Sequence, residues 1–209
     1  MILFHFPHCG EANESYLAWS KGLPDHAKLL RVELSQPGLS MRDISSAMWE
    51  KAVTEASLFV QKQLGTGEEF MFMGHCWGSL LAFEVSHRLK MEGGAQPAHL
   101  FLSGCSAPHL LRPRSDSTRL RMSAALACEC EPLEDYQASM SREPLQMRFS
   151  IFAGKQDALA PVDQLAEWSR YTAKICDVHV CEGDHDHWQQ DSMRWFQMVQ
   201  TIVEREYAF

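Results

Sequence analysis

The segment Glu69-Phe70-Met71-Phe72-Met73-Gly74-His75-Cys76-Trp77-Gly78 carries the strongest structural signal in the chain. Its first five residues predict a buried strand, and the residues from Gly74 onward predict a tight turn that leads into a helix over Ser79–Lys90. A Gly-x-nucleophile-x-Gly turn between a strand and a helix is the nucleophile elbow, whose small flanking residues let two backbones approach closely. We therefore predict that Cys76 is a catalytic nucleophile and not an ordinary core cysteine.

The elbow also explains why a cysteine could react there. The N-terminus of a helix stabilises negative charge, and a thiol beside a helix end and an imidazole becomes more acidic. A cysteine nucleophile accordingly needs a nearby histidine. The preceding residue, His75, is expected to pack at the elbow and to take no part in catalysis.

Working outward from the elbow, apolar runs and helical periodicities alternate along the chain. Strands are predicted at Ile2–Phe6, Leu29–Leu34, Glu69–Met73, His99–Ser103, Met147–Ala153 and Ile175–Cys181. Helices are predicted at Glu14–Leu23, Met41–Gln63, Ser79–Lys90, Asp163–Tyr171 and Ser192–Tyr207. This alternation predicts an α/β protein with a mostly parallel sheet and helices on both faces. The exception, at about 108–144, is interpreted as an insertion.

Composition limits the classes of function. The length of 209 residues, with 45% hydrophobic residues, predicts one globular domain over 1–209. A formal charge of −8 argues against nucleic-acid binding, because phosphates require a basic face. The chain contains no apolar run of about 18 residues, so no membrane span is expected. The N-terminus does not resemble a signal peptide.

The cysteines predict a reducing compartment and no metal site. Seven cysteines at irregular spacing predict free thiols in the cytoplasm and not a disulfide framework. Cys128 and Cys130 are too close for a Cys-x-x-Cys motif, and no second pair completes a zinc site. We expect neither a metal nor a cofactor bound by the protein.

An acid and a base for Cys76 are expected after later strands, in the order nucleophile, acid, histidine. Asp157 follows the strand that ends at Ala153, at the sheet edge where catalytic groups of open α/β sheets gather. It is expected to be free for this task, because Asp163 is the better cap for the next helix.

The base is sought after the last strand, in the sequence Glu182-Gly183-Asp184-His185-Asp186-His187. His185 is the preferred base and His187 is the alternative. The alternating acids and histidines could also suggest a metal site, but adjacent donors on one loop cannot easily surround an ion.

The chain resembles type II thioesterases, the stand-alone editing enzymes of polyketide and nonribosomal peptide synthesis, which have the α/β-hydrolase fold. The resemblance covers nearly the whole length, and several motifs occur in the family's order. They are Phe4-His5-Phe6-Pro7-His8-Cys9-Gly10, Trp19, Gln36-Pro37-Gly38, Gly74–Leu89, Ser103-Gly104-Cys105-Ser106-Ala107-Pro108-His109, Gly154 with Asp157 and Trp168, and Gly183-Asp184-His185.

The resemblance implies a site, a substrate and partners. It implies a catalytic triad of Cys76, Asp157 and His185. The preference for His185 over His187 as the base rests mainly on this resemblance. It implies an oxyanion hole formed by the backbone N–H groups of Cys9 and Trp77, which would face the tetrahedral oxyanion. The substrate would be an acyl or aminoacyl thioester on the phosphopantetheine of an acyl or peptidyl carrier protein. Family members usually act as monomers.

Three departures from the family pattern leave the fate of the acyl group open. The family has serine where this chain has Cys76, Cys9 and Glu11 replace an alanine and a glycine, and the lid insertion at about 108–144 is shorter. A cysteine acyl-enzyme is a thioester, nearly isoenergetic with the substrate. Hydrolysis is therefore the first hypothesis, transfer to a second carrier thiol the second, and an inactive carrier-binding relative the third.

A basic group begins the insertion and consists of Arg112, Arg114, Arg119 and Arg121. These side chains could meet a phosphopantetheine phosphate or a carrier helix. An ordinary solvated arginine face is the alternative interpretation.

Overall fold

The computed structural model describes residues 1–8, 13–23, 27–35, 45–111, 142–190 and 192–207. Six strands of these residues form one sheet in the order β2-β1-β3-β4-β5-β6, and every neighbouring pair is parallel. The strands are β1 (Ile2–Phe6), β2 (Lys28–Arg31), β3 (Phe70–His75), β4 (His99–Ser103), β5 (Arg148–Gly154) and β6 (Cys176–Cys181). The predicted parallel sheet of an α/β protein is confirmed.

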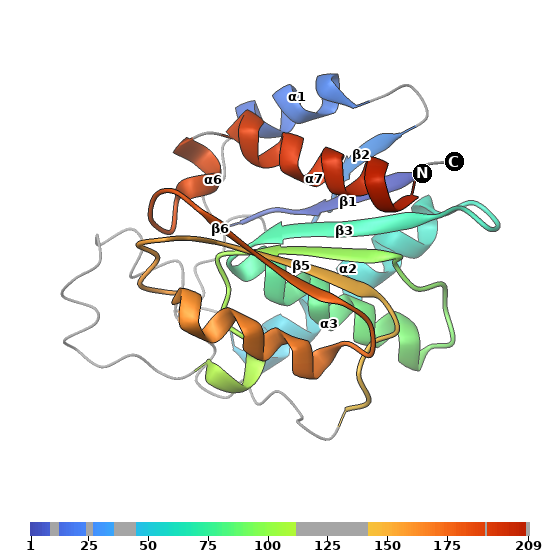
Figure 1. The fold of residues 1–209 in the computed structure, drawn as a ribbon. Helices are drawn as coiled ribbons and strands as arrows, with labels where there is room; N and C mark the ends of the chain where they lie inside the picture. Colours follow the sequence, from blue (N-terminus) through green and yellow to red (C-terminus); the bar gives the residue numbers. More distant parts are fainter. Residues whose placement is uncertain (9–12, 24–26, 36–44, 112–141, 191, 208–209) are drawn as a thin grey trace.

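Helices cover both faces of this sheet (Figure 1). One face carries α1 (Asn13–Gly22) and α7 (Ser192–Tyr207), and the other carries α2 (Ser46–Gln63) and α3 (Trp77–Met91). The remaining elements are the 3₁₀ helices η2 (Pro108–Leu110) and η3 (Val162–Tyr171) and the short helix α6 (His187–Gln190). Because the strands are parallel, the segments that follow β3, β4, β5 and β6 meet at one edge of the sheet.

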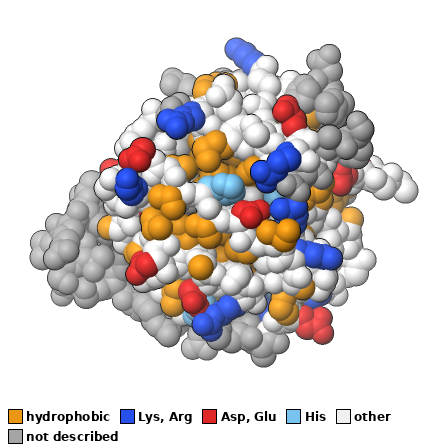
Figure 2. Space-filling view, in the orientation of Figure 1, with side chains coloured by type: hydrophobic (Ala, Val, Ile, Leu, Met, Phe, Trp, Pro, Cys, Tyr) orange, Lys and Arg blue, Asp and Glu red, His pale blue; other side chains and the backbone are white. Residues whose placement is uncertain are grey.

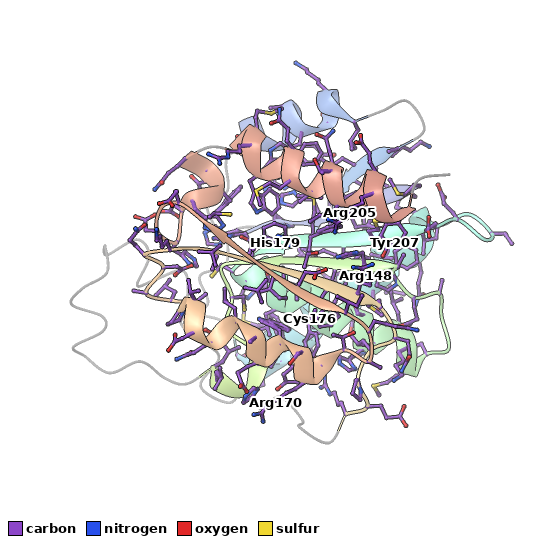
Figure 3. The ribbon with its side chains drawn as sticks, in the orientation of Figure 1. Arg148, Arg170, Cys176, His179, Arg205 and Tyr207 are labelled. Atoms are coloured by element: carbon purple, nitrogen blue, oxygen red, sulfur yellow. The ribbon has the colours of Figure 1, made fainter. Side chains whose placement is uncertain are left out.

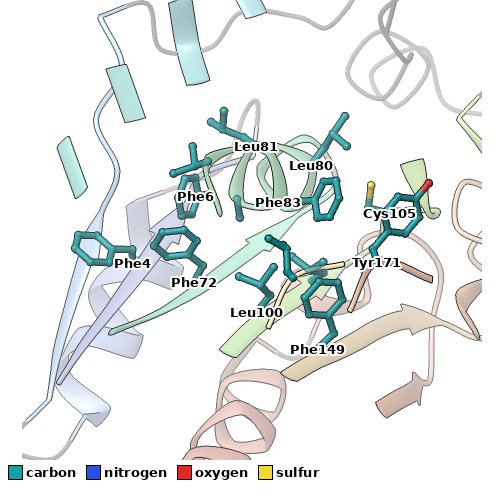
Figure 4. Packing of buried hydrophobic residues seen from close by; sticks show 14 of the residues in the cluster. Phe4, Phe6, Phe72, Leu80, Leu81, Phe83, Leu100, Cys105, Phe149 and Tyr171 are labelled. Atoms are coloured by element: carbon teal, nitrogen blue, oxygen red, sulfur yellow. The ribbon is translucent and has the colours of Figure 1, made fainter. Parts of the chain in front are cut away.

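Two apolar clusters, one on each face, hold the layers together. Phe4 and Phe72 pack edge to face with centroids 5.9 Å apart, under α2 and α3 (Figure 4). On the opposite face Trp19 of α1 stacks on Phe196 of α7 with centroids 5.5 Å apart. Every side chain of β1, β3 and β4 is buried, as expected for strands covered on both sides.

The predicted elements exist, and most differences lie at their ends. The second strand is shorter than predicted and ends at Arg31. The turn at the elbow is tighter than predicted, because β3 continues to His75 and α3 begins at Trp77. The helix predicted at Asp163–Tyr171 is a 3₁₀ helix capped by Pro161, so the prediction that Asp163 caps it is wrong. The body of the predicted insertion, 112–141, and the start of the predicted helix at Met41 lie outside the described residues.

In the described part of the chain, no helix is both long and apolar enough to cross a membrane. The cysteines that it contains are free, namely Cys76, Cys105, Cys176 and Cys181.

Candidate active site

The elbow places Cys76 alone between β3 and α3, with φ of 49° and ψ of −114°. It is the only non-glycine residue with positive φ in the described chain. Such a conformation costs on the order of 1–3 kcal/mol and is typical of functional sites. The turn requires its glycines, because a side chain on Gly74 would meet the backbone of Gly78, and one on Gly78 would meet the backbone of Phe6.

His185 and Asp157 are the partners that the fold brings to this turn. The Nδ1 of His185 donates to Oδ2 of Asp157 at 3.0 Å, and His185 is also hydrogen-bonded to Cys76. The other carboxylate oxygen of Asp157 accepts from the backbone N–H groups of Leu159 (2.8 Å) and Ala160 (3.0 Å). Asp157 therefore orients His185 and also closes its own turn.

The electrostatics of this group favour an ion pair. Burial lowers the pKa of His185, but the charge of Cys76 and the bonds to Asp157 and Cys76 together outweigh it and raise that pKa to about 10. Burial raises the pKa of Asp157, but the bond and charge of His185 and the N–H groups of Ala160 and Leu159 together outweigh burial and lower it, so the carboxyl stays ionised. A protonated His185 between two anions is the arrangement that supports a thiolate nucleophile.

A second chain of hydrogen bonds lies behind the first and includes the alternative base. Nδ1 of His187 lies 3.1 Å from the carbonyl oxygen of Asp184, and its Nε2 lies 3.2 Å from Oγ of Ser103. Oγ of Ser103 lies 3.1 Å from Nδ1 of His75. If His187 donates to the carbonyl, Ser103 donates to His187 and His75 donates to Ser103. His187 is thus bonded away from Asp157, and His185 is the histidine that contacts both Asp157 and Cys76.

Within this second chain of hydrogen bonds, the ring of His75 is neutral. Burial, together with the charges of His185, His8 and His187, holds the pKa of His75 well below its usual range. Its Nε2 is buried and makes no hydrogen bond. The ring lies against that of His185 with centroids 4.7 Å apart.

Two further glycines let these rings and loops come together. Gly104 has φ of 58°, and a side chain there would contact Cε1 of His75 and lie 3.0 Å from Cε1 of His185. A side chain on Gly154 would meet the carbonyl oxygens of Gly183 and Asp184. Gly154 therefore allows the His185 loop to pass close to the end of β5.

The structure brings together three of the predicted site residues, Cys76, Asp157 and His185. Trp77 begins α3, where the first backbone N–H groups have no partner within the helix. The other predicted oxyanion residue, Cys9, and the four arginines Arg112, Arg114, Arg119 and Arg121 lie outside the described residues.

Sequence reasoning missed the supporting residues. Ser103 and Gly104 belong to the motif Ser103–His109, and a serine that ends an apolar strand, followed by a glycine, indicates a loop at the carboxyl end of the sheet. Ser79 was also missed; its hydroxyl lies 2.8 Å from the carbonyl oxygen of Gly74 and 2.9 Å from that of Ser103, and so ties the elbow to β4. Within the described residues, no three His, Cys, Asp or Glu side chains are placed to hold a metal ion.

Comparison with known proteins shows which family the chain is similar to. The family model described as a thioesterase domain matches residues 1–127. The chain is 23% identical over 98% of its length to the linear gramicidin dehydrogenase LgrE of Brevibacillus parabrevis, covering 88% of it. It is 24% identical over 88% of its length to the gramicidin S biosynthesis protein GrsT of Aneurinibacillus migulanus, covering 81%.

A solved structure shares the fold. The thioesterase RedJ of the prodiginine pathway of Streptomyces coelicolor superposes with a TM-score of 0.77 at 24% identity, over 96% of this chain and 84% of RedJ. The predicted α/β-hydrolase fold is thereby confirmed. Since the family model matches more than half of the 209 residues and begins at the first strand, this chain belongs to the thioesterase domain family.

Proposed function

We propose that this protein hydrolyses acyl or aminoacyl thioesters on the phosphopantetheine arm of carrier proteins, through a covalent intermediate on Cys76. The observation that carries the proposal is the contact of His185 with both Cys76 and Asp157 at the end of a parallel sheet. That arrangement supplies a nucleophile, a base and an orienting acid to one reacting carbon.

The names of similar proteins support this class of substrate. RedJ and GrsT belong to the prodiginine and gramicidin S pathways, respectively. LgrE is named a dehydrogenase, which is a different chemistry. The present chain contains no Gly-x-Gly-x-x-Gly sequence, the dinucleotide-binding motif that follows a strand in many dehydrogenases. The acid, base and nucleophile at one site favour acyl chemistry.

The reaction follows from the roles of the three side chains. The Cys76 thiolate attacks the thioester carbonyl, and the tetrahedral oxyanion would face the backbone N–H groups of Trp77 and Cys9. Collapse expels the phosphopantetheine thiolate, which takes the proton of His185. His185 then removes a proton from water as the water attacks the acyl-enzyme, and the second collapse releases the acid and restores the Cys76 thiolate and the protonated His185.

Transfer is the second candidate, and the identity of the nucleophile favours it. An acyl group on the sulfur of Cys76 remains a thioester, so its exchange with a carrier thiol is nearly balanced in free energy. The same intermediate can therefore pass the acyl group to a second carrier instead of water. The two reactions share every step up to the acyl-enzyme.

The test is mass spectrometry of an acylated carrier protein incubated with the full chain. Release of free acid without an acceptor carrier supports hydrolysis, and an acyl-enzyme that discharges only to an added acceptor supports transfer. Cys76→Ala is the control and should abolish covalent loading. An alanine variant that still becomes acylated, or a wild-type protein that never does, would overturn the assignment.

Carrier docking by Arg112, Arg114, Arg119 and Arg121 is part of the proposal. Reversing two of these charges should raise KM for carrier-bound substrates but leave small soluble thioesters unaffected, because only the carrier substrates use the docking contact. Equal effects on both substrates would refute docking.

A further inference from the structure

The indole of Trp77 carries a polar group that the fold leaves without a partner. Trp77 is 6% exposed, and its Nε1–H makes no hydrogen bond to any group of the described residues. A buried donor without an acceptor is unfavourable, and a buried indole N–H usually finds one. The indole of Trp168, for example, donates to the carbonyl oxygen of Cys105 at 2.8 Å. The N–H of Trp77 is therefore suited to a ligand that brings an acceptor.

Trp77 is placed so that its ring lies at the end of the sheet where Cys76 is found. Trp77 is the first residue of α3 and directly follows Cys76. Side chains of a helix lean toward its N-terminus, so this ring leans past the start of α3. α3 starts at the carboxyl edge of the sheet, where the arrow of β3 ends in Figure 1. A substrate of Cys76 must approach that same edge.

A contact with α2 independently supports this placement. The rings of Trp77 and Trp49 meet edge to face with centroids 5.4 Å apart. Trp49 lies in the first turn of α2. Because α2 joins β2 to β3, two strands that run in the same direction, its first turn also lies at the carboxyl edge. The two rings thus form an aromatic wall at this edge.

We propose that the Nε1–H of Trp77 donates a hydrogen bond to an oxygen of the substrate that lies close to the thioester. The inference rests on the proposed function, in which the backbone N–H of Trp77 faces the thioester oxygen. A donor at hydrogen-bond distance from that oxygen places the thioester carbon within about 4 Å of the Trp77 nitrogen. Atoms a few bonds from this carbon then lie near the indole of the same residue.

Two parts of such a substrate carry an oxygen at that separation. An acyl chain with a hydroxyl or keto group on its third carbon offers one, and the amide carbonyl of the phosphopantetheine arm nearest the sulfur offers the other. Both are neutral oxygen acceptors, which an indole N–H can bond because it is a donor only. A substrate without that oxygen leaves the donor buried and unpaired, so the site should disfavour it.

The test compares the loading of Cys76 by four small thioesters, measured by mass spectrometry. The acyl group is 3-hydroxybutyryl or butyryl, and the thiol is N-acetylcysteamine, which carries the amide, or 1-pentanethiol, which lacks it. Trp77→Phe keeps an aromatic ring but removes the donor. It should slow loading about tenfold or more for thioesters that supply the acceptor, and leave butyryl pentanethiol unchanged. A loss that follows the hydroxyl assigns the bond to the acyl chain, and one that follows the amide assigns it to the arm.

Trp195→Phe is the matched control. Trp195 of α7 is 3% exposed, packs on Phe152, and has an Nε1–H that also lacks a partner among the described residues. α7, which carries Arg205 and Tyr207 in Figure 3, covers the opposite face of the sheet from α3. Trp195→Phe thus makes the same chemical change on the other face, and should leave the loading of all four thioesters unchanged.

A second control excludes adsorption of the alkyl chains to the surface. Figure 2 shows apolar side chains gathered on one face of the molecule. Ile175, Val178 and Val180, at and beside β6, are 54%, 39% and 49% exposed. Val178→Thr keeps the branched shape but makes this face more polar, and should not change how loading depends on the oxygen. A variant that did change it would place the discrimination at β6 and overturn the assignment to Trp77.

The indole N–H signal of Trp77 gives a readout that needs no reaction. In the ¹H–¹⁵N spectrum of Cys76→Ala, the indole signal lost on adding Trp77→Phe belongs to Trp77. Thioesters that supply the acceptor should move this signal downfield, and the matched thioester without the oxygen should not. A signal that responds equally to both or to neither, or equal slowing of all four thioesters by Trp77→Phe, would overturn this inference alone. Wild-type protein that none of the four loads would instead overturn the proposed function.

Discussion

The imidazole rings of His75 and His185 lie against each other with centroids 4.7 Å apart, and His185 is hydrogen-bonded to Cys76. Burial and neighbouring charges hold the pKa of His75 well below its usual range, whereas the pKa of His185 is raised to about 10. The chain from His75 through Ser103 to His187 holds the neutral ring in place. We infer that His75 positions His185 without contacting the substrate.

His75→Asn should therefore slow acylation of Cys76 about tenfold or more, because the shorter side chain no longer supports the ring of His185. A tenfold effect corresponds to about 1.4 kcal/mol in the barrier. The rate is measured as loading of Cys76 by mass spectrometry, beside thermal unfolding. His87→Asn is the matched control, since His87 is also a buried histidine, with its ring against Phe83 of α3. It should lose stability but keep its acylation rate, and equal slowing in both variants would show that His75 acts only through stability.

His185 should hold its proton across the neutral range, because its pKa is raised to about 10 from an ordinary value of about 6.5. In an NMR titration its ring signals should stay constant near pH 7 and change near pH 10. A raised pKa means that the proton of His185 is lost only as the pH rises through the folded value, so His185 stays protonated at neutral pH. Removing either anion, by Cys76→Ala or Asp157→Asn, should lower this pKa. A wild-type ring that titrates near 6.5 would contradict the ion pair.

The parallel sheet and the elbow could be predicted because their signals are local. The apolar run Phe70–Met73, two glycines and an amphipathic helix follow one another in sequence, and each constrains its own backbone. Asp157 and His185 could be predicted from their positions after strands, since strand ends of a parallel sheet share one edge.

The supporting residues could not be predicted, because their contacts are not local in the sequence. The bonds from His75 to Ser103 and from Ser103 to His187 join residues far apart in the sequence. The capping role given to Asp163 failed because η3 starts after Pro161 as a 3₁₀ helix, while Asp157 accepts the turn N–H groups itself. Local rules rank a cap but do not show which of two aspartates the tertiary turn will use.

Gly104→Ala should disrupt the site more than its backbone conformation alone explains. Its φ of 58° costs alanine about 1 kcal/mol, and the added methyl group would also press on His75 and His185. Gly93→Ala separates the two effects, because Gly93 has φ of 67° and nothing within 4 Å of the new methyl group. We expect both variants to melt earlier, with a larger loss for Gly104→Ala, and only that variant to lose acylation of Cys76. Equal losses of thermal stability in the two variants would mean that the rings of His75 and His185 move aside at no cost and that the contact does not matter.

Cys76→Ser distinguishes the two fates of the acyl group. A serine acyl-enzyme is an oxygen ester, lower in free energy than a thioester, so return of the acyl group to a carrier thiol becomes unfavourable while attack by water remains favourable. If the wild-type protein transfers acyl groups, the ratio of acceptor-bound acyl group to free acid should fall at least about tenfold in this variant. Cys105→Ser is the control, because Cys105 is as buried as Cys76, at 8% exposure, and follows a neighbouring strand. Wild-type protein that releases only free acid with the acceptor present would leave hydrolysis as the reaction, because the thioester on Cys76 would then discharge to water faster than to any offered thiol.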